Sequence, residues 1–348
     1  MSKPEKILHV LNSRVYSGAE VVAAQIIRAF SDRAELAYCS PESEEVSRML
    51  QSQGIRHVRV KTLTPWSLAR VIRREKPDII HAHDMRSCFF AALCWGKTQL
   101  LFHIHNNAMD ARRIGVKSVA FGLASLRAKH IFWVSPGALH CYRFGKAVAK
   151  KSSVLRNVVD TDALFRKLSA DPEHYGYDIV FCGRLAPEKD PLRFLRVCAL
   201  VKKEKPDLRA AVIGDGELEE DCRRLARELG LTDQVSFLGY RPNPVKILHD
   251  STLIALTSLW EGCGLVVMEA MALGTPAVCT DVDGLRGILL VGETGFYGRT
   301  DGELADAMVR ILRDPRLRAS LSERGRAHFE AINDPESYYR VLSEHYGL

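Results

Sequence analysis

Strand-length apolar runs alternate with helix-length amphipathic stretches along most of this chain, and the alternation limits the folds that it can adopt. The apolar runs lie at residues 7–11, 36–39, 58–60, 78–81, 99–103, 130–134, 153–155, 178–182, 210–213, 235–238, 253–257 and 277–279. Helical patterns lie between them, as at 17–30, 43–53, 67–75, 111–128, 191–203, 217–229 and 244–250. Strands that alternate with helices build βαβ units and a parallel sheet. The sequence therefore predicts an α/β fold.

The length of 348 residues predicts two domains of ordinary size. Residues 157–176 are polar and weakly periodic, which places a linker there and predicts domains at 1–160 and 161–334. Residues 1–157 hold 25 Lys and Arg against 11 Asp and Glu, a net of +14, whereas residues 158–348 hold 24 against 31, a net of −7. This asymmetry indicates a different partner for each half. The alternative is a solvated basic surface without a partner.

Composition excludes several classes of protein. No window approaches the ~20 uninterrupted apolar residues of a membrane span. The chain begins Met-Ser-Lys-Pro and soon enters the first apolar run, so no signal peptide is predicted. Its nine cysteines are scattered and form no CxxC pair, which argues against a disulfide framework or a zinc site. We expect a cytoplasmic protein.

The stretch 259–278 carries the strongest functional signal. Two glycines shape a turn before a helical segment, which leaves the backbone N–H groups of Gly264, Leu265 and Val266 able to bind an anion or a hydroxyl. Glu261 and Glu269 add two acceptor-only carboxylates at the same end. A ligand that carries both phosphates and many hydroxyls suits these groups. The stretch therefore predicts a sugar-nucleotide site.

Glu261 and Glu269, separated by seven residues, resemble the E-x7-E signature of family 4 retaining nucleotide-sugar glycosyltransferases. The spacing alone fits any helix with a charged face, but the neighbouring glycines and the ending A-x-G-x-P-A-V strengthen the match. The resemblance implies the GT-B architecture, in which two Rossmann-like doubly wound domains face a central cleft. It also implies that a last helix, at about 335–348, crosses back to the N-terminal domain. The acceptor would bind the N-terminal domain and the nucleotide sugar the C-terminal domain.

Two further segments of the second half resemble that family. Arg184 and Lys189 follow a predicted strand and match the loop G-R-x-x-x-x-K-D, which implies that they hold the donor diphosphate and neutralise it as it leaves. Without that match, two such cations would indicate only surface solvation. Tyr240 and Arg241 resemble the segment that cups the nucleobase, although packing of Tyr240 at the surface fits equally well. The G-x-G turn at 214–216 is interpreted as structural support for the cleft.

In the first half, Gly18 resembles the glycine that approaches the diphosphate from the opposite side, with Ser17 in place of a second glycine. Four histidines lie at strand ends: His81, His83, His103 and His105. Their spacing in the sequence does not provide the third and fourth ligands of a zinc site, so no metal is predicted. The resemblance gives His105 the place of the active-site histidine near the donor sugar. The alternative is a packing residue.

Two departures from the family bear on selectivity. Cys263 replaces the bulky apolar residue usual after E-G, which alters the pocket wall near the sugar. The segment 280–287 has Asp283 and Gly287 in place of a double glycine and a glutamate. Asp281 and Asp283 also form a D-x-D tripeptide, which is the metal-binding signature of another glycosyltransferase architecture. We interpret this match as incidental.

The resemblance implies transfer of a sugar from a nucleoside diphosphate to a glycan or lipid-linked acceptor, with retention of anomeric configuration, in cell-surface polysaccharide biosynthesis. It implies no metal cofactor and no nucleic-acid partner. The catalytic candidates are His105, Arg184, Lys189 and Glu261. The donor-binding candidates are Gly18, Arg184, Lys189, Tyr240, Arg241, Glu261, Cys263, Gly264, Leu265, Val266 and Glu269. The alternatives are a sugar-nucleotide epimerase or hydrolase on the same fold, and a non-catalytic sugar-nucleotide-binding protein.

Residues 109–129 carry five cations and a single acid among apolar residues. This pattern predicts peripheral contact with an anionic membrane, where each Lys or Arg near the surface contributes about 1 kcal/mol. That contact would place the protein at the inner face of the membrane, beside a lipid-linked acceptor. The alternative is an ordinary helix of the N-terminal domain.

Overall fold

The computed structural model describes residues 5–94, 96–107 and 109–348. The prediction that the chain has no signal peptide rests on its first four residues, which lie outside the described residues. The chain divides into two compact units. The first unit comprises residues 1–157 and 335–348, and the second comprises 158–334. The sequence places the boundary three residues later, after 160.

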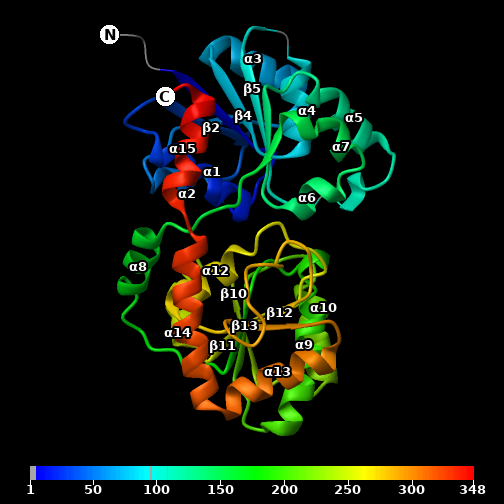
Figure 1. The fold of residues 1–348 in the computed structure, drawn as a ribbon, viewed down its shortest axis with the longest axis vertical. Coiled ribbons are helices and arrows are strands. Elements are labelled where there is room, and N and C mark those ends of the chain that lie inside the picture. Colours follow the sequence, from blue (N-terminus) through cyan, green and yellow to red (C-terminus); the bar gives the residue numbers. More distant parts are fainter. Residues whose placement is uncertain (1–4, 95, 108) are drawn as a thin grey trace. The chain divides into compact units, whose positions relative to one another are not determined.

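The first unit is built on a seven-stranded parallel sheet with the order β3-β2-β1-β4-β5-β6-β7 (Figure 1). Its strands are β1 (Lys6–Val10), β2 (Glu35–Pro41), β3 (His57–Val60), β4 (Ile79–Ala82), β5 (Gln99–Ile104), β6 (His130–Trp133) and β7 (Ser152–Val154). The order reverses between β1 and β4, which is the mark of a doubly wound sheet. All seven strands coincide with predicted apolar runs.

The helices of the first unit are α1 (Gly18–Ala29), α2 (Glu44–Gln51), α3 (Pro65–Glu75), α4 (Met85–Leu93), α5 (Val116–Ser125), α6 (Pro136–Cys141), α7 (Gly145–Val148) and α15 (Pro335–Tyr346). The sequence analysis missed α4, whose sequence MRSCFFAAL has no polar face, and the short α6 and α7. It also began α5 too early, because residues 109–111 form a separate 3-10 turn and the helix starts after Gly115.

The C-terminal helix α15 belongs to the first unit, as the resemblance implies. Leu342 and Tyr346 are buried, and the Tyr346 ring lies edge-on against Phe30 at the end of α1. Gln25 Nε2 of α1 donates to Tyr339 Oη at 2.9 Å. The helix is therefore held by apolar packing and by a polar contact to α1.

The second unit is built on a six-stranded parallel sheet with the order β10-β9-β8-β11-β12-β13. Its strands are β8 (Ile179–Cys182), β9 (Ala210–Ile213), β10 (Val235–Gly239), β11 (Leu253–Leu256), β12 (Ala277–Thr280) and β13 (Gly295–Gly298). This is the Rossmann order 3-2-1-4-5-6, with its reversal between β8 and β11. The two sheets confirm the predicted α/β fold of two doubly wound, Rossmann-like domains.

The helices of the second unit are α8 (Thr161–Ser169), α9 (Pro191–Glu204), α10 (Glu219–Glu228), α11 (Val245–Asp250), α12 (Leu265–Leu273), α13 (Asp301–Arg313) and α14 (Pro315–Ile332). The expected linker at 157–176 is wrong in part, because α8 lies within it. Asp160 caps that helix by accepting from Ala163 N, and only Leu164 is buried, so the sequence shows no apolar periodicity there. No helix among the described residues combines the length and apolar character needed to cross a membrane.

Candidate active site

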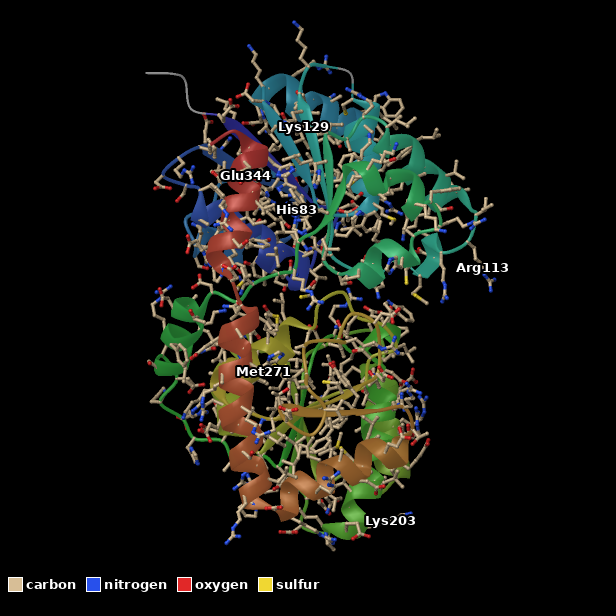
Figure 2. All side chains as sticks on the ribbon, in the orientation of Figure 1. His83, Arg113, Lys129, Lys203, Met271 and Glu344 are labelled. Atoms are coloured by element: carbon tan, nitrogen blue, oxygen red, sulfur yellow. The ribbon has the colours of Figure 1, made fainter. Side chains whose placement is uncertain are left out.

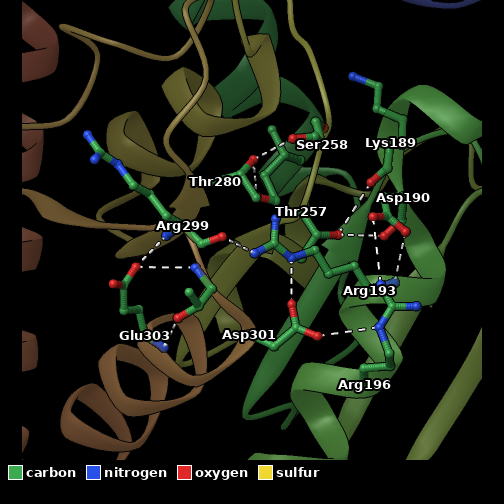
Figure 3. Close-up of polar contacts among 12 residues, drawn as sticks. Lys189, Asp190, Arg193, Arg196, Thr257, Ser258, Thr280, Arg299, Asp301 and Glu303 are labelled. Carbon is green, nitrogen blue, oxygen red and sulfur yellow. Dashed lines mark hydrogen bonds and ion pairs between the residues drawn. The ribbon is translucent and has the colours of Figure 1, made fainter.

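The reversal point of the second sheet brings two loops together at the carboxyl ends of adjacent strands. The loop after β8 contains Arg184 and Lys189, and the loop after β11 contains Glu261. Thr257 Oγ1 donates to the backbone carbonyl of Asp190 at 2.9 Å, and Leu259 N donates to the carbonyl of Glu188 at 2.9 Å (Figure 3). Side-chain and backbone hydrogen bonds therefore fix one loop against the other.

Lys189 and Glu261 form the central ion pair of this site, with Lys189 Nζ bonded to Glu261 Oε1. Ser258 Oγ donates to the same carboxylate oxygen at 2.6 Å. The Glu261 side chain is 7% exposed and that of Lys189 is 24% exposed, so the glutamate side chain is buried and the lysine side chain is partly exposed. The pair neutralises a buried charge and orients both groups.

Arg184 lies apart from that pair. Its Nη2 donates to Glu188 Oε1 at 2.8 Å, and 48% of its side chain is exposed. The guanidinium has five N–H donors and this contact uses one of them. Arg184 is therefore a cation at the exposed edge of the loop that retains donors for a phosphate.

The glycines at 214 and 216 set the shape of the Arg184 loop. A Cβ on Gly214 would stand 2.0 Å from the Gly183 carbonyl oxygen, and one on Gly216 would stand 2.5 Å from that of Leu185. Leu185 N donates to Asp215 O at 2.7 Å. The two turns thus pack backbone to backbone, which agrees with a supporting role for the G-x-G turn.

The N-terminus of α12 supplies hydrogen-bond donors to the same region. Gly264 caps the helix in the left-handed region at φ 56°, and a Cβ there would stand 2.3 Å from Leu285 Cδ2. Only glycine fits both the backbone angle and the space. The N–H groups of Leu265 and Val266 have no partner within the helix, because the first turn of any helix leaves its donors free.

Glu269 lies one turn further along α12, on the same face as Leu265. Burial raises the pKa of its carboxyl group, while Lys167 acts in the opposite direction. No described residue donates a hydrogen bond to this carboxylate, and Glu269 as a whole is only partly buried. Burial also raises the pKa of the nearby Cys182 thiol to about 12, so this cysteine is no nucleophile at neutral pH.

Two candidates lie further from the ion pair. Tyr240 and Arg241 follow β10 and are exposed, and β9 separates their strand from β8. Cys263 is buried in the turn before α12.

Gly284 is a site residue that the sequence analysis missed. A Cβ there would stand 1.9 Å from the Glu261 carbonyl oxygen, so the segment after β12 packs directly on the Glu261 backbone. In the same segment Arg286 pairs with Asp281 at 2.7 Å and with Asp283 at 2.6 Å, and Arg299 also pairs with Asp281. These arginines occupy both carboxylates of the D-x-D tripeptide, in agreement with its interpretation as incidental.

In the first unit, Gly18 begins α1 after Ser17. Ser17 N donates to Glu20 Oε2 at 3.0 Å and Ser17 Oγ donates to it at 2.9 Å, which holds the start of the helix. A Cβ on Gly18 would meet nothing within 4 Å. The fold itself does not require glycine at this position, which leaves the helix N-terminus open to an approaching ligand.

His105 follows β5 and belongs to a buried group of histidines. His83 Nδ1 lies 2.9 Å from His105 Nε2, and His83 Nε2 lies 2.8 Å from His9 Nδ1. Burial lowers the pKa of His105 to about 3, so it is neutral at neutral pH. The four predicted histidines do come together, with His9 as a fifth that the sequence analysis missed. Among the described residues of the first unit, two trios within this group could hold a metal ion, His9, His81 and His83, and His83, His103 and His105.

Comparisons with known proteins bear on both units. Residues 16–163 match the family model described as Glycosyltransferase Family 4, and residues 166–328 match the one described as Glycosyl transferases group 1. The chain is 27% identical over 271 residues to an Escherichia coli UDP-Gal:alpha-D-GlcNAc-diphosphoundecaprenol alpha-1,3-galactosyltransferase, covering 71% of this chain and 70% of that protein.

A second relative is the uncharacterized glycosyltransferase MJ1059 of Methanocaldococcus jannaschii, 26% identical over 238 residues, which are 62% of this chain and 58% of that protein. Several other matches span about half the length of the curated relative. Among solved structures, the Anabaena protein Alr3699/HepE in complex with UDP-glucose superposes with a TM-score of 0.85 at 21% identity, over 98% of each chain. The chain therefore consists of a Glycosyltransferase Family 4 domain followed by a Glycosyl transferases group 1 domain, and it belongs to the glycosyltransferases of the GT-B fold.

Proposed function

We propose that this protein transfers a sugar from a nucleoside-diphosphate sugar to a glycan or lipid-linked acceptor, with retention of anomeric configuration. The observation that carries the proposal is the Lys189–Glu261 pair at the reversal point of the second sheet, beside the free donors of α12. Open parallel sheets bind their ligands at this point. The group 1 family match covers the same residues.

The roles follow from where charge develops during transfer. As the sugar leaves, negative charge grows on the diphosphate, and donors already aimed at it are the largest catalytic contribution. We assign that role to Arg184, Lys189 and the backbone N–H groups at the start of α12. Because these groups supply positive charge, the transfer needs no metal. Glu261 would bind the sugar hydroxyls and Glu269 the ribose hydroxyls.

The family resemblance also implies donor contacts from residues of the first unit. We assign Gly18 to the diphosphate and His105 to the donor sugar, on the strength of the family resemblance. A neutral imidazole can donate one hydrogen bond and accept one, which suits a sugar hydroxyl. Tyr240 and Arg241 are assigned to the base, and Cys263 to the wall near the sugar.

A thermal-shift screen of nucleoside-diphosphate sugars tests the proposal. A ligand present at about 100 times its Kd stabilises the folded state by about 2.7 kcal/mol. We expect one nucleotide sugar to raise Tm clearly and its nucleoside diphosphate to raise it less. If no member of a panel covering the uracil, guanine, adenine and thymine nucleotides changes Tm, the proposal is wrong. Epimerisation or hydrolysis of the bound donor without an acceptor would indicate the alternative enzymes, and binding without turnover would indicate a sensor.

The surface around α5 supports an acceptor presented at a membrane. Ile114, Val116, Leu123 and Leu126 are 67%, 90%, 60% and 74% exposed. Exposed Arg112 and Arg113, and Lys117, lie in the same stretch, and Figure 2 shows Arg113 projecting from the edge of the first unit. Apolar side chains among cations are the features of an interfacial membrane contact. We propose that this α5 surface, residues 112–126, docks on an anionic membrane where a cell-surface polysaccharide precursor is extended, at the inner face of a cytoplasmic membrane.

Vesicle co-sedimentation tests the docking. We expect binding to anionic vesicles that falls with added salt, and binding several-fold weaker in an Arg112→Ala, Arg113→Ala, Lys117→Ala variant. A matched variant, Arg48→Ala, Arg70→Ala, Arg73→Ala, removes the same charge from α2 and α3 of the same unit and should bind like the wild type. Equal binding to anionic and zwitterionic vesicles would contradict the docking and favour a soluble acceptor.

A further inference from the structure

Five histidines of the first unit form one buried cluster. His9 comes from β1, His81 and His83 from β4 and its end, and His103 and His105 from β5 and its end. Residues two apart on a strand face the same side of a sheet, and His9 pairs directly with His81 in the register of β1 and β4. Four of the five side chains are at most 1% exposed, and Figure 2 places His83 in the interior of the unit.

Half of the ring nitrogens in this cluster have no hydrogen-bond partner. The five imidazoles carry ten nitrogens between them. Three contacts use five of these: His9 Nδ1 with His83 Nε2 at 2.8 Å, His83 Nδ1 with His105 Nε2 at 2.9 Å, and His81 Nδ1 with Tyr346 Oη at 2.6 Å. The other five are buried without a partner: His9 Nε2, His81 Nε2, His103 Nδ1, His103 Nε2 and His105 Nδ1.

Several of these unpartnered nitrogens must present a lone pair. Each neutral imidazole has one N–H and one lone pair, so the cluster holds five of each. Each of the two contacts that link His9, His83 and His105 uses one lone pair, whichever ring donates the proton. The contact with Tyr346 uses one more lone pair if the tyrosine hydroxyl donates, and none if His81 donates. Two or three buried lone pairs therefore remain outside these three contacts in every arrangement of protons, and Asn157, which lies close to His105, could serve at most one of them.

We propose that this cluster binds one divalent transition-metal ion of the zinc type. Candidate ligand atoms of His9, His81 and His83 all lie within 4.8 Å of one another, as do those of His83, His103 and His105. Neutral imidazole is a preferred ligand of Zn²⁺, Co²⁺, Ni²⁺ and Cu²⁺, and it must give up no proton to bind them. If His81 Nδ1 donates to Tyr346 Oη, its Nε2 keeps the lone pair for the ion, and the contact orients the ring.

The ion would tie β1, β4 and β5 together beneath the C-terminal helix. His105 is the one member of the cluster that is only partly buried, so it marks the side from which an ion enters. The site lies in the first unit, whereas Lys189 and Glu261 lie in the second. Of the cluster, only His105 is also assigned to the donor, and metal retention is measured without donor, so the inference does not depend on the proposed function.

Metal retention by the full-length protein tests the inference. Wild-type protein is loaded with ZnCl₂ or CoCl₂, passed through gel filtration and analysed for metal. We expect about one equivalent per chain, and with Co²⁺ a visible ligand-field absorption that added Zn²⁺ removes. The double variant His81→Phe, His103→Phe leaves neither trio complete and should retain less than about a tenth of an equivalent.

These two positions are chosen because the His103 side chain makes no hydrogen bond to a described residue, that of His81 makes only the one to Tyr346, and phenylalanine keeps a ring at each. Circular dichroism checks the fold of the double variant. Should it fail to fold, the single variants His81→Phe and His103→Phe take its place, and one of the two should lose the ion because each removes one trio. His130→Phe makes the same change on β6, outside the cluster, and should retain metal like the wild type. The inference is overturned if the wild type retains less than a tenth of an equivalent, as it would if water fills the cluster, or if folded cluster variants retain metal fully.

Discussion

Replacing Lys189 with alanine is expected to lower kcat by roughly a hundredfold to a thousandfold, the loss seen when one oxyanion-type donor is removed. Lys189 is the cation that joins the two loops of the candidate active site, and its partner Glu261 lies just before the free donors of α12. Arg184→Ala is expected to reduce kcat on the same scale. Steady-state kinetics with a saturating donor measure both effects.

Stability separates a catalytic effect from a folding effect. Lys189→Ala leaves the buried Glu261 carboxylate without its cation, so this variant is expected to be destabilised as well. The double variant Lys189→Ala, Glu261→Gln removes the unpaired charge and should recover stability without recovering kcat. Arg184 pairs with Glu188 at the surface, so its removal should change the free energy of unfolding by less than about 1 kcal/mol. Near-normal kcat in both single variants would show that the diphosphate is held elsewhere.

The two glutamates are expected to respond to different parts of the donor. Glu269→Gln should weaken binding of the nucleoside diphosphate and of the whole donor alike, by roughly tenfold or more, because a hydrogen bond to a charged group contributes about 1.5–3 kcal/mol. Glu261→Gln should leave the nucleoside diphosphate nearly unaffected and weaken only the intact sugar nucleotide.

Isothermal titration calorimetry with both ligands measures this difference. Glu269 receives no hydrogen bond from a described residue, so its exchange for glutamine breaks none and removes only the charge that Lys167 faces. Glu261 accepts from Lys189 and Ser258, and Ser258→Ala serves as a control for the loss of that internal contact. If the two glutamine variants lose affinity for both ligands in the same proportion, the division of roles is wrong.

Much of the fold could be predicted because apolar runs of strand length are fully buried here. All residues of β4, β9, β11 and β12 are buried, and each strand shows as a short apolar run. The prediction failed where a helix buries little or where glycines interrupt a strand. Helix α8 buries only Leu164, and β13 begins and ends with glycine, so neither carries a periodic signal.

The site could be predicted in part for a similar reason. Lys189 and Glu261 are 72 residues apart, yet each follows a strand, and adjacent parallel strands bring their carboxyl ends together. Gly284 and His9 could not be found in this way. Gly284 matters through backbone packing against Glu261, and His9 joins the other histidines only through the register of β1 and β4. Such contacts depend on tertiary structure that no local pattern encodes.

The stereochemistry of the product tests the central claim most directly. The protein is incubated with an α-configured donor identified by the thermal-shift screen and with a panel of prenyl-diphosphate-linked sugars. Proton NMR of the new glycoside then reports its anomeric coupling constant. We predict an α-linked product that forms only when donor and acceptor are both present. A β-linked product, or donor consumed without any new glycoside, would contradict retaining transfer at this site.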